Sequence, residues 1–185
     1  MRVIAGTCKG RRLLSPDWSG LRPTSDRLRG TLFDVLGGRI EGARLLDGCA
    51  GTGAVGIEAL SRGAAHVVFV ERDARAVTLI RHNVVHCDLG DRCTIHRGEL
   101  PRVLEGDTAP YDLILLDPPY GAPDINAILS ATATRLVPGG LLVLERARRA
   151  DTAPVATLVS LRQVRAGDSV LEFFGPVDDS TALTE

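Results

Sequence analysis

Short runs of consecutive apolar residues alternate along the chain with stretches of helical spacing. From residue 43 onward the apolar runs predict five strands, at Ala43–Leu46, Val67–Val70, Thr94–Ile95 (the weakest), Leu113–Leu116 and Leu141–Leu144. Between them, apolar residues three or four positions apart predict amphipathic helices, as at Val77, Ile80 and Val84. Continuous apolar strands are typical of a parallel sheet that helices cover on both faces. The pattern therefore predicts a doubly wound α/β fold.

The two ends of the chain depart from this alternation. Residues 1–20 hold two short apolar segments around a glycine-containing turn and predict a β-hairpin extension. Leu161–Val164 and Ser169–Phe174 predict a second hairpin near the C-terminus. Pro138-Gly139-Gly140 predicts a turn just before the fifth strand. We expect two units, the N-terminal extension at residues 1–20 and one α/β domain at residues 21–185.

The charge along the chain is unevenly distributed. The 185 residues carry a formal net charge of -1, yet residues 1–29 hold seven basic residues against two acidic ones. The seven are Arg2, Lys9, Arg11, Arg12, Arg22, Arg27 and Arg29. A basic segment on a mildly acidic body indicates contact with a polyanion, although a solvated Arg-rich face explains it equally well.

Composition excludes several classes of protein. The chain is 44% hydrophobic, enough for a single well-packed core. We find neither a signal peptide nor an apolar run approaching the ~20 residues that span a bilayer, so we expect a cytoplasmic protein with no membrane contact. The four cysteines have no paired spacing typical of a zinc site or a disulfide framework. We therefore expect reduced thiols and no metal.

A glycine-rich loop follows the first predicted strand. Gly51, Gly53 and Gly56 form a G-x-G-x-x-G pattern, where glycine lets the backbone approach a nucleotide closely. Glu71 ends the second strand and is placed to accept hydrogen bonds from ribose hydroxyls. Asp47, just before the loop, would repel a pyrophosphate but suits an ammonium group. The loop thus favours S-adenosylmethionine, and an NAD-dependent oxidoreductase stays an alternative.

The tetrad Asp117-Pro118-Pro119-Tyr120 ends the fourth predicted strand. Carboxyl ends of neighbouring strands line one crevice, so we expect Asp117 beside the glycine loop. Two prolines fix the backbone and leave the Pro118 carbonyl free to accept, while the Tyr120 ring can stack on a flat substrate. Asp117 and the Pro118 carbonyl can hold both N–H bonds of an aromatic amine, whose nitrogen then attacks a sulfonium methyl in line. The tetrad predicts amino-group methylation.

These motifs give the sequence a resemblance to class I S-adenosylmethionine-dependent methyltransferases. More narrowly, it resembles the RsmD family of 16S ribosomal RNA guanine-N2 methyltransferases, through Met1–Leu14, Leu21–Leu36, Leu46–Ala64 and Asp117–Tyr120. The resemblance implies a Rossmann-like, mostly parallel seven-stranded sheet whose last two strands form the C-terminal hairpin. It also implies methyl transfer to N2 of a guanine in 16S ribosomal RNA, within a partly or fully assembled small subunit. An adenine or cytosine amine in DNA is the alternative substrate.

The resemblance also implies which residues form the site. The catalytic residues would be Asp117, Pro118, Pro119 and Tyr120. The cofactor would be bound by Asp47, Cys49, Ala50, Gly51, Thr52, Gly53, Glu71, Arg72, Gly98, Glu99 and Leu100. The basic N-terminal segment, for its part, predicts RNA phosphate contacts at Lys9, Arg11, Arg12 and Arg22.

Two positions depart from the family pattern, and one segment has two interpretations. Gly30 stands where relatives usually have Glu, and Glu99 stands where they often have Asp or Asn near the adenine amine. The segment Arg22–Arg27 predicts either a lid over the cofactor cleft or an ordinary helix start, with Thr24 or Ser25 as the cap.

Overall fold

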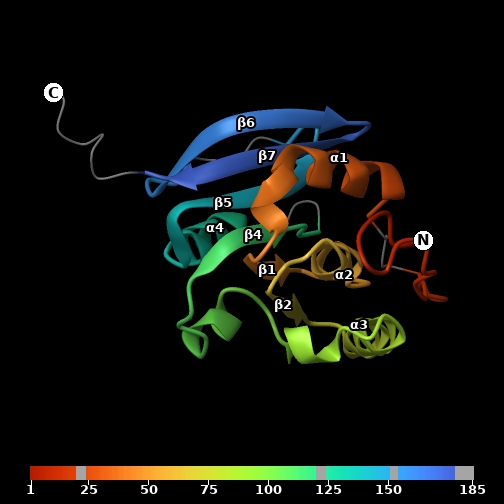
Figure 1. Cartoon of the computed structure of the whole chain (residues 1–185). Coiled ribbons are helices and arrows are strands. Elements are labelled where there is room, and N and C mark those ends of the chain that lie inside the picture. The colour runs from red at the N-terminus through yellow and green to blue at the C-terminus, as the bar shows by residue number, and fades with distance from the viewer. Residues whose placement is uncertain (20–23, 120–123, 151–153, 178–185) are drawn as a thin grey trace, which may run out of the picture.

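A computed structural model describes residues 1–19, 24–119, 124–150 and 154–177. Its centre is a seven-stranded sheet in the order β3-β2-β1-β4-β5-β7-β6 (Figure 1). The five parallel strands are β1 (Arg44–Gly48), β2 (His66–Glu71), β3 (Cys93–Arg97), β4 (Tyr111–Leu116) and β5 (Leu136–Ala147). The antiparallel hairpin consists of β6 (Leu158–Ala166) and β7 (Ser169–Pro176). The predicted mostly parallel, doubly wound sheet is confirmed.

Helices cover both faces of the sheet. One face carries α1 (Asp26–Leu36), α2 (Ala54–Ser61) and α3 (Ala74–His86). The other carries α4 (Ile125–Ala133) and the 3-10 turn η3 (Arg102–Glu105). Two further 3-10 turns are η1 (Gly37–Ile40) and η2 (Gly90–Arg92). The strand order reverses between β1 and β4, and in open α/β sheets ligands bind outside the carboxyl ends of strands at such a point.

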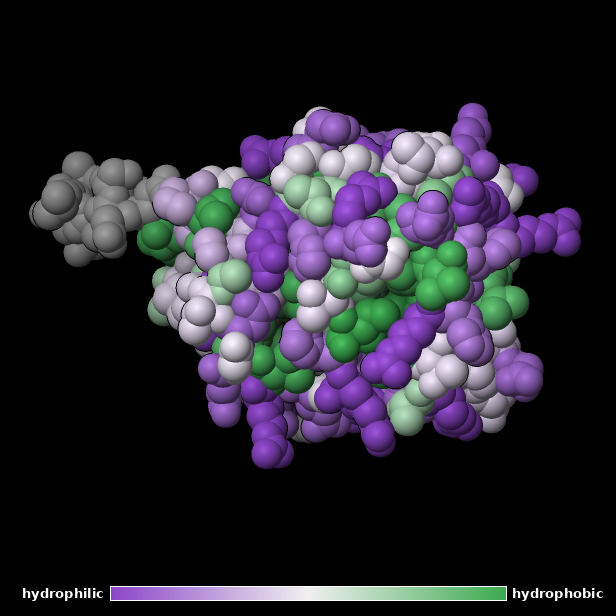
Figure 2. Space-filling view, turned by 60° about the horizontal axis from the view of Figure 1, so that its bottom comes forward, coloured by the Kyte–Doolittle hydropathy of each residue, from purple (hydrophilic) through white to green (hydrophobic). Residues whose placement is uncertain are grey.

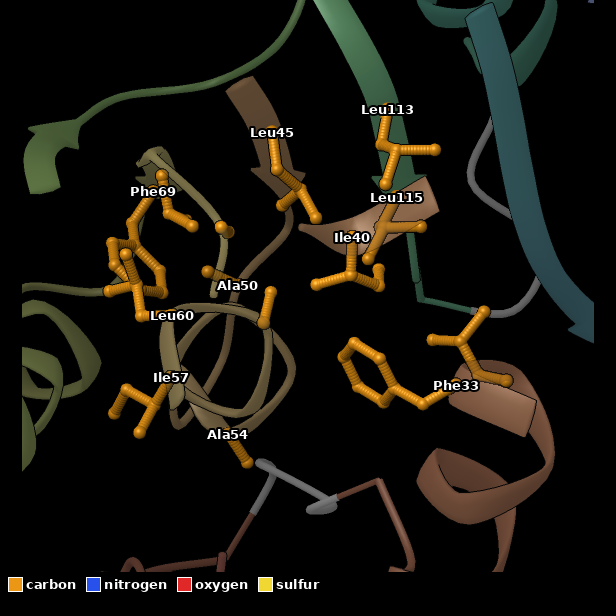
Figure 3. Packing of buried hydrophobic residues seen from close by; sticks show 14 of the residues in the cluster. Phe33, Ile40, Leu45, Ala50, Ala54, Ile57, Leu60, Phe69, Leu113 and Leu115 are labelled. Atoms are coloured by element: carbon orange, nitrogen blue, oxygen red, sulfur yellow. The ribbon is translucent and has the colours of Figure 1, made fainter. Parts of the chain in front are cut away.

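Successive side chains of the central strands enter two separate hydrophobic clusters. Leu45 packs under α1 and α2, whereas its neighbour Leu46 packs under α4 and η3. Figure 3 shows Phe33 of α1 and Ile57 of α2 in the first cluster, on the same side of the sheet as Leu45. Both faces of these strands are therefore buried, as the continuous apolar runs predict.

The start of α1 settles which residue is its cap. The Ser25 hydroxyl accepts a hydrogen bond from the backbone N–H of Leu28 at 3.1 Å, which satisfies one of the unpaired donors of the first turn. Thr24 has a different partner, described below with the site. The helix-start interpretation therefore holds, with Ser25 as the cap.

Residues 1–14 form an N-terminal ribbon with one antiparallel bridge, between Arg2 and Arg12. Val3 and Leu13, next to the bridged residues, are buried in the first hydrophobic cluster. The buried Glu58 carboxylate of α2 accepts hydrogen bonds from the backbone N–H of Ile4 at 2.7 Å and of Ala5 at 2.9 Å. The ribbon is thus fixed to α2 and shares the core of the sheet.

The predicted turn before the fifth strand is wrong. Pro138, Gly139 and Gly140 lie inside β5, whose pairing with β4 shifts register between Tyr111 and Leu113. Gly139 has a φ of 74° there. Pro and Gly in a strand often mark such an irregularity, because Pro cannot donate to the ladder and Gly can take a positive φ.

One face of the molecule is largely polar (Figure 2). Figure 2 shows one face, on which hydrophilic side chains surround a smaller group of hydrophobic ones. Across the part of the chain that the structure describes, no helix is long and apolar enough to cross a membrane.

Gly56 is required by the close packing of α2 on β2. A Cβ at this position would lie 2.3 Å from Cε1 of Phe69, a buried residue of β2. We expect Gly56→Ala to lower the free energy of unfolding by about 1–3 kcal/mol, the usual cost of overpacking. At Gly30 of α1 an added Cβ would meet no atom within 4 Å, so Gly30→Ala should raise the free energy of unfolding by about 0.5–1 kcal/mol. Thermal unfolding followed by circular dichroism compares the two, and equal melting temperatures would contradict the packing argument.

Candidate active site

The carboxyl ends of β1 and β4 meet at the switch point of the sheet. Gly48 of β1 pairs in register with Leu116 of β4, and the backbone N–H of Asp117 donates to the Gly48 carbonyl at 3.4 Å. Asp47 precedes Gly48, so the Asp47 and Asp117 carboxylates line one small pocket beneath α1. The structure thus brings the fourth-strand tetrad to the beginning of the glycine loop.

The glycine loop turns sharply between β1 and α2. Cys49, Gly51 and Gly53 all have positive φ, at 62°, 55° and 74°. Its backbone is tied to β2, because the Ala50 N–H donates to the Val70 carbonyl at 3.0 Å. Only glycine adopts such φ values without strain, which accounts for Gly51 and Gly53 in the pattern.

Two carboxylates hold this loop from opposite sides. Asp47 accepts from the Gly56 N–H at 2.9 Å, inside the first turn of α2. Glu71, at the end of β2, accepts from the N–H of Gly51 and of Asp73, both at 2.8 Å. Each Glu71 oxygen has a second lone pair, which can accept from a ligand hydroxyl.

The site concentrates negative charge. Burial, together with the nearby Asp117 and Glu71 carboxylates, raises the pKa of Asp47 to about 8. Burial and the Glu71 charge likewise raise the pKa of the Cys49 thiol to about 12. The Asp47 carboxyl therefore keeps its proton at neutral pH until a positive charge arrives.

The acidic residues of the site indicate which nucleotide cofactor it can bind. S-adenosylmethionine carries an ammonium and a sulfonium group, and both would relieve the repulsion between Asp47, Glu71 and Asp117. A dinucleotide would instead place its anionic pyrophosphate beside the Glu71 and Asp117 carboxylates, which repel it, and beside the buried Asp47 carboxyl, which it would keep protonated. The residues present fit S-adenosylmethionine.

The other predicted cofactor residues follow β2 and β3. Arg72 and Glu99 are exposed and pair with each other at 3.2 Å. Gly98 donates its N–H to the Glu71 carbonyl at 3.0 Å, which ties the two strand ends together. The Leu100 side chain lies against Gly48, since a Cβ added at Gly48 would be 2.7 Å from Cδ1 of Leu100. Thr52 is buried, and its carbonyl accepts from the Asn83 side chain at 3.3 Å.

Two polar residues near Asp117 were not assigned from the sequence. The Thr24 hydroxyl, just before α1, donates to Oδ2 of Asp117 at 3.1 Å. Glu145 of β5 lines the same pocket as Asp47 and Asp117. Its Oε1 accepts from the Ser169 hydroxyl at 2.9 Å. Only one of the two interpretations of the Arg22–Arg27 segment places Thr24 at the cofactor cleft, and no sequence pattern indicates Glu145.

The structure describes only some residues of the tetrad and of the basic segment. Pro118 is buried and Pro119 is exposed, whereas Tyr120 and Arg22 lie outside the described residues. Lys9, Arg11 and Arg12 are exposed on the N-terminal ribbon. No group of three or more His, Cys, Asp or Glu side chains that could hold a metal ion occurs among the residues that the structure describes.

Arg29, one of the seven basic residues in residues 1–29, is not on the surface. Its side chain is fully buried in α1 and pairs with Asp26 at 2.6 Å. It also donates to the carbonyls of Arg2 at 2.8 Å and Ala54 at 3.3 Å. Arg29 therefore joins α1, α2 and the ribbon and has no exposed surface for a polyanion.

A family model described as "Conserved hypothetical protein 95" matches residues 1–175. The chain belongs to this family. It is 34% identical over 173 residues to the candidate rRNA methyltransferase YlbH of Bacillus subtilis, covering 90% of this chain and 94% of that protein. It is 38% identical over 120 residues to Ribosomal RNA small subunit methyltransferase D of Escherichia coli, covering 65% of this chain and 60% of that protein.

The solved structures agree with this membership. The candidate methyltransferase yhhF of Escherichia coli superposes with a TM-score of 0.85 at 30% identity, covering 95% of this chain and 97% of that chain. The predicted resemblance, the class I methyltransferase fold and the methyltransferase enzyme class are confirmed. The Conserved hypothetical protein 95 family thus includes this chain, and the individual site residues remain predictions.

Proposed function

We propose that the chain transfers a methyl group from S-adenosylmethionine to the exocyclic N2 amine of a guanine in 16S ribosomal RNA. The observation that carries the proposal is the meeting of Asp117 and the Asp47 loop at one pocket. The names of the relatives support ribosomal RNA of the small subunit as the substrate.

The residues of the glycine loop and the tetrad would have separate roles in this reaction. Asp47 and Glu71 would hold the methionine ammonium and the ribose, and the backbone of residues 49–53 would line the cofactor. When bound, S-adenosylmethionine supplies a methyl group on a positively charged sulfur. The Asp117 carboxylate and the Pro118 carbonyl would accept the two N–H bonds of the guanine amine and aim its nitrogen at that methyl.

Charge completes the argument for Asp117. The attacking nitrogen becomes more positive as it bonds to carbon, so a fixed carboxylate beside it stabilises the transition state. The extra proton on nitrogen then passes to solvent. Tyr120 would stack on the guanine ring, which has to leave its neighbours to reach the pocket.

Methyl incorporation into three substrates tests the proposal. Transcribed 16S ribosomal RNA, small subunits from cells that lack this protein, and duplex DNA are incubated with radiolabelled S-adenosylmethionine, and the products are mapped by mass spectrometry. We expect N2-methylguanine in the RNA or the subunits. Label in an adenine or cytosine of the DNA would support the alternative substrate, and label in none of the three would refute the proposal.

Thr24 offers a test of how Asp117 is oriented. Thr24→Val removes the hydroxyl that donates to Asp117 and keeps the shape of the side chain. We expect a loss in kcat of about 3–10-fold, the equivalent of one hydrogen bond, with an unchanged melting temperature. Ser25→Ala is the matched control: it should lower stability by about 1 kcal/mol through the lost cap and leave kcat unchanged. Thr24→Ser should restore activity; a Thr24→Val enzyme with full kcat would remove Thr24 from the site.

A further inference from the structure

An open hollow lies between the N-terminal ribbon and the start of α1. It has a volume of about 330 Å³ and is lined by Met1, Arg2, Arg12, Leu13 and Asp26. Figure 1 shows the ribbon, in red, beside the first turn of α1. Of its lining residues, only Arg12 has an expected role so far, as an RNA phosphate contact.

Two arginines set the charge of the hollow. Arg2 and Arg12 are directly opposite in the antiparallel bridge, so their side chains project to the same side of the ribbon. Both are exposed, and within the described ranges neither guanidinium has an ion-pair or hydrogen-bond partner. Their neighbours Val3 and Leu13 are buried, which fixes the direction in which Arg2 and Arg12 point.

The acidic residue of the hollow is already neutralised. Asp26 accepts from the buried Arg29 at 2.6 Å. The same Arg29 nitrogen donates to the carbonyl of Arg2 at 2.8 Å. Arg29 therefore holds the ribbon and α1 together beneath the hollow, whose net charge is positive. Two neighbouring guanidinium groups that have no partner in the described part of the chain are suited to bind a phosphate through their N–H donors.

The hollow adjoins the candidate active site. Met1, on its wall, contacts the glycine loop, with its Sδ 3.7 Å from the Thr52 hydroxyl. Asp26, another residue of the lining, stands two residues after Thr24, whose hydroxyl donates to Asp117. A nucleotide held at Asp117 would therefore have its neighbour on the strand close to the hollow.

We propose that this hollow is a subsite for a phosphate of the RNA strand next to the target guanine. The inference rests on the function proposed above and refines its RNA contacts. Arg11 differs from Arg2 and Arg12, because its guanidinium donates to the His86 carbonyl at 2.8 Å and so is directed toward α3. Arg2, which the sequence motifs did not single out, joins Arg12 as a principal phosphate contact.

The double variant Arg2→Gln/Arg12→Gln tests the subsite. We expect the KM for 16S ribosomal RNA to rise about 10-fold or more, with kcat at saturating RNA and the affinity for S-adenosylmethionine unchanged. The slope of log K for RNA binding against log salt should become shallower by about 1, because one phosphate contact is lost. Arg2→Lys/Arg12→Lys keeps the charge without the paired donors and should fall between the variant and the wild type.

Arg162→Gln/Arg165→Gln is the matched control. It removes two exposed arginines from β6, the strand at the far edge of the sheet. We expect an RNA KM and salt slope close to those of the wild type. If Arg2→Gln/Arg12→Gln matches this control, the subsite is wrong although the enzyme is active. If wild-type protein methylates no RNA, the proposed function fails separately, and the RNA-binding slope still decides whether Arg2 and Arg12 contact phosphate.

Discussion

Asp117→Ala is expected to reduce methyl transfer by about 10²–10⁴-fold while S-adenosylmethionine still binds. The carboxylate lies beside Asp47 at the switch point, where it would accept an N–H of the target amine and balance the charge that develops on nitrogen. Because the loss concerns the transition state, it should appear in kcat with little change in the KM for S-adenosylmethionine. Single-turnover methylation of small subunits measures it.

A matched control lies on the same strand. Asp112 is an exposed residue near the opposite end of β4 and accepts from the Arg44 N–H at 2.8 Å. Asp112→Ala should keep kcat within about twofold, because surface substitutions seldom act over such a distance. Asp117→Asn keeps one acceptor oxygen and should retain more activity than Asp117→Ala. Full activity of Asp117→Ala would remove this residue from catalysis.

The sequence predicted most of the sheet because burial leaves a direct pattern in it. The four apolar runs of four residues each overlap a strand of the structure: β1 begins one residue after its run does and ends two residues beyond it, and β2, β4 and β5 contain their whole runs. The fifth strand was predicted too short, since Pro138 and two glycines interrupt its pattern. A register shift opposite Tyr111 accommodates them, and such a shift depends on the neighbouring strand.

The site was predictable where one short segment carries its chemistry and not where distant segments meet. The glycine loop and the tetrad are each contiguous, and their strands place them together. The contact of Thr24 with Asp117 joins residues 93 positions apart, and no local pattern encodes it. Arg29 looks in sequence like any other residue of the basic segment, yet the three partners that it joins keep it buried.

The buried Asp47 is expected to make cofactor binding depend on pH. Its pKa of about 8 means that the free protein holds the proton at pH 6–7, whereas a bound ammonium group would favour the carboxylate. Binding then releases one proton, and affinity for S-adenosylmethionine should rise about tenfold per pH unit from pH 6 to about 7.5. Above that range the ammonium group itself begins to lose its proton, so the rise should level off.

The variant Asp47→Asn tests whether Asp47 is the group that releases this proton. Asn cannot titrate, so the affinity of the variant for S-adenosylmethionine should be nearly constant over pH 6–7.5. Because the affinity of the wild type rises over the same range, the difference between the two proteins should grow with pH. Calorimetry in two buffers of different ionisation enthalpy counts the released proton directly, and it needs no RNA and no turnover. S-adenosylhomocysteine, which keeps the ammonium and lacks the sulfonium, should show the same pH dependence if the ammonium is the partner.

The raised pKa of Asp47 should also affect folding. Because this pKa rises from 3.8 to about 8 in the folded protein, the ligand-free protein should lose stability as pH rises through that interval, and Asp47→Asn should not. A wild-type affinity that does not change with pH would show that Asp47 does not receive the cofactor's positive charge.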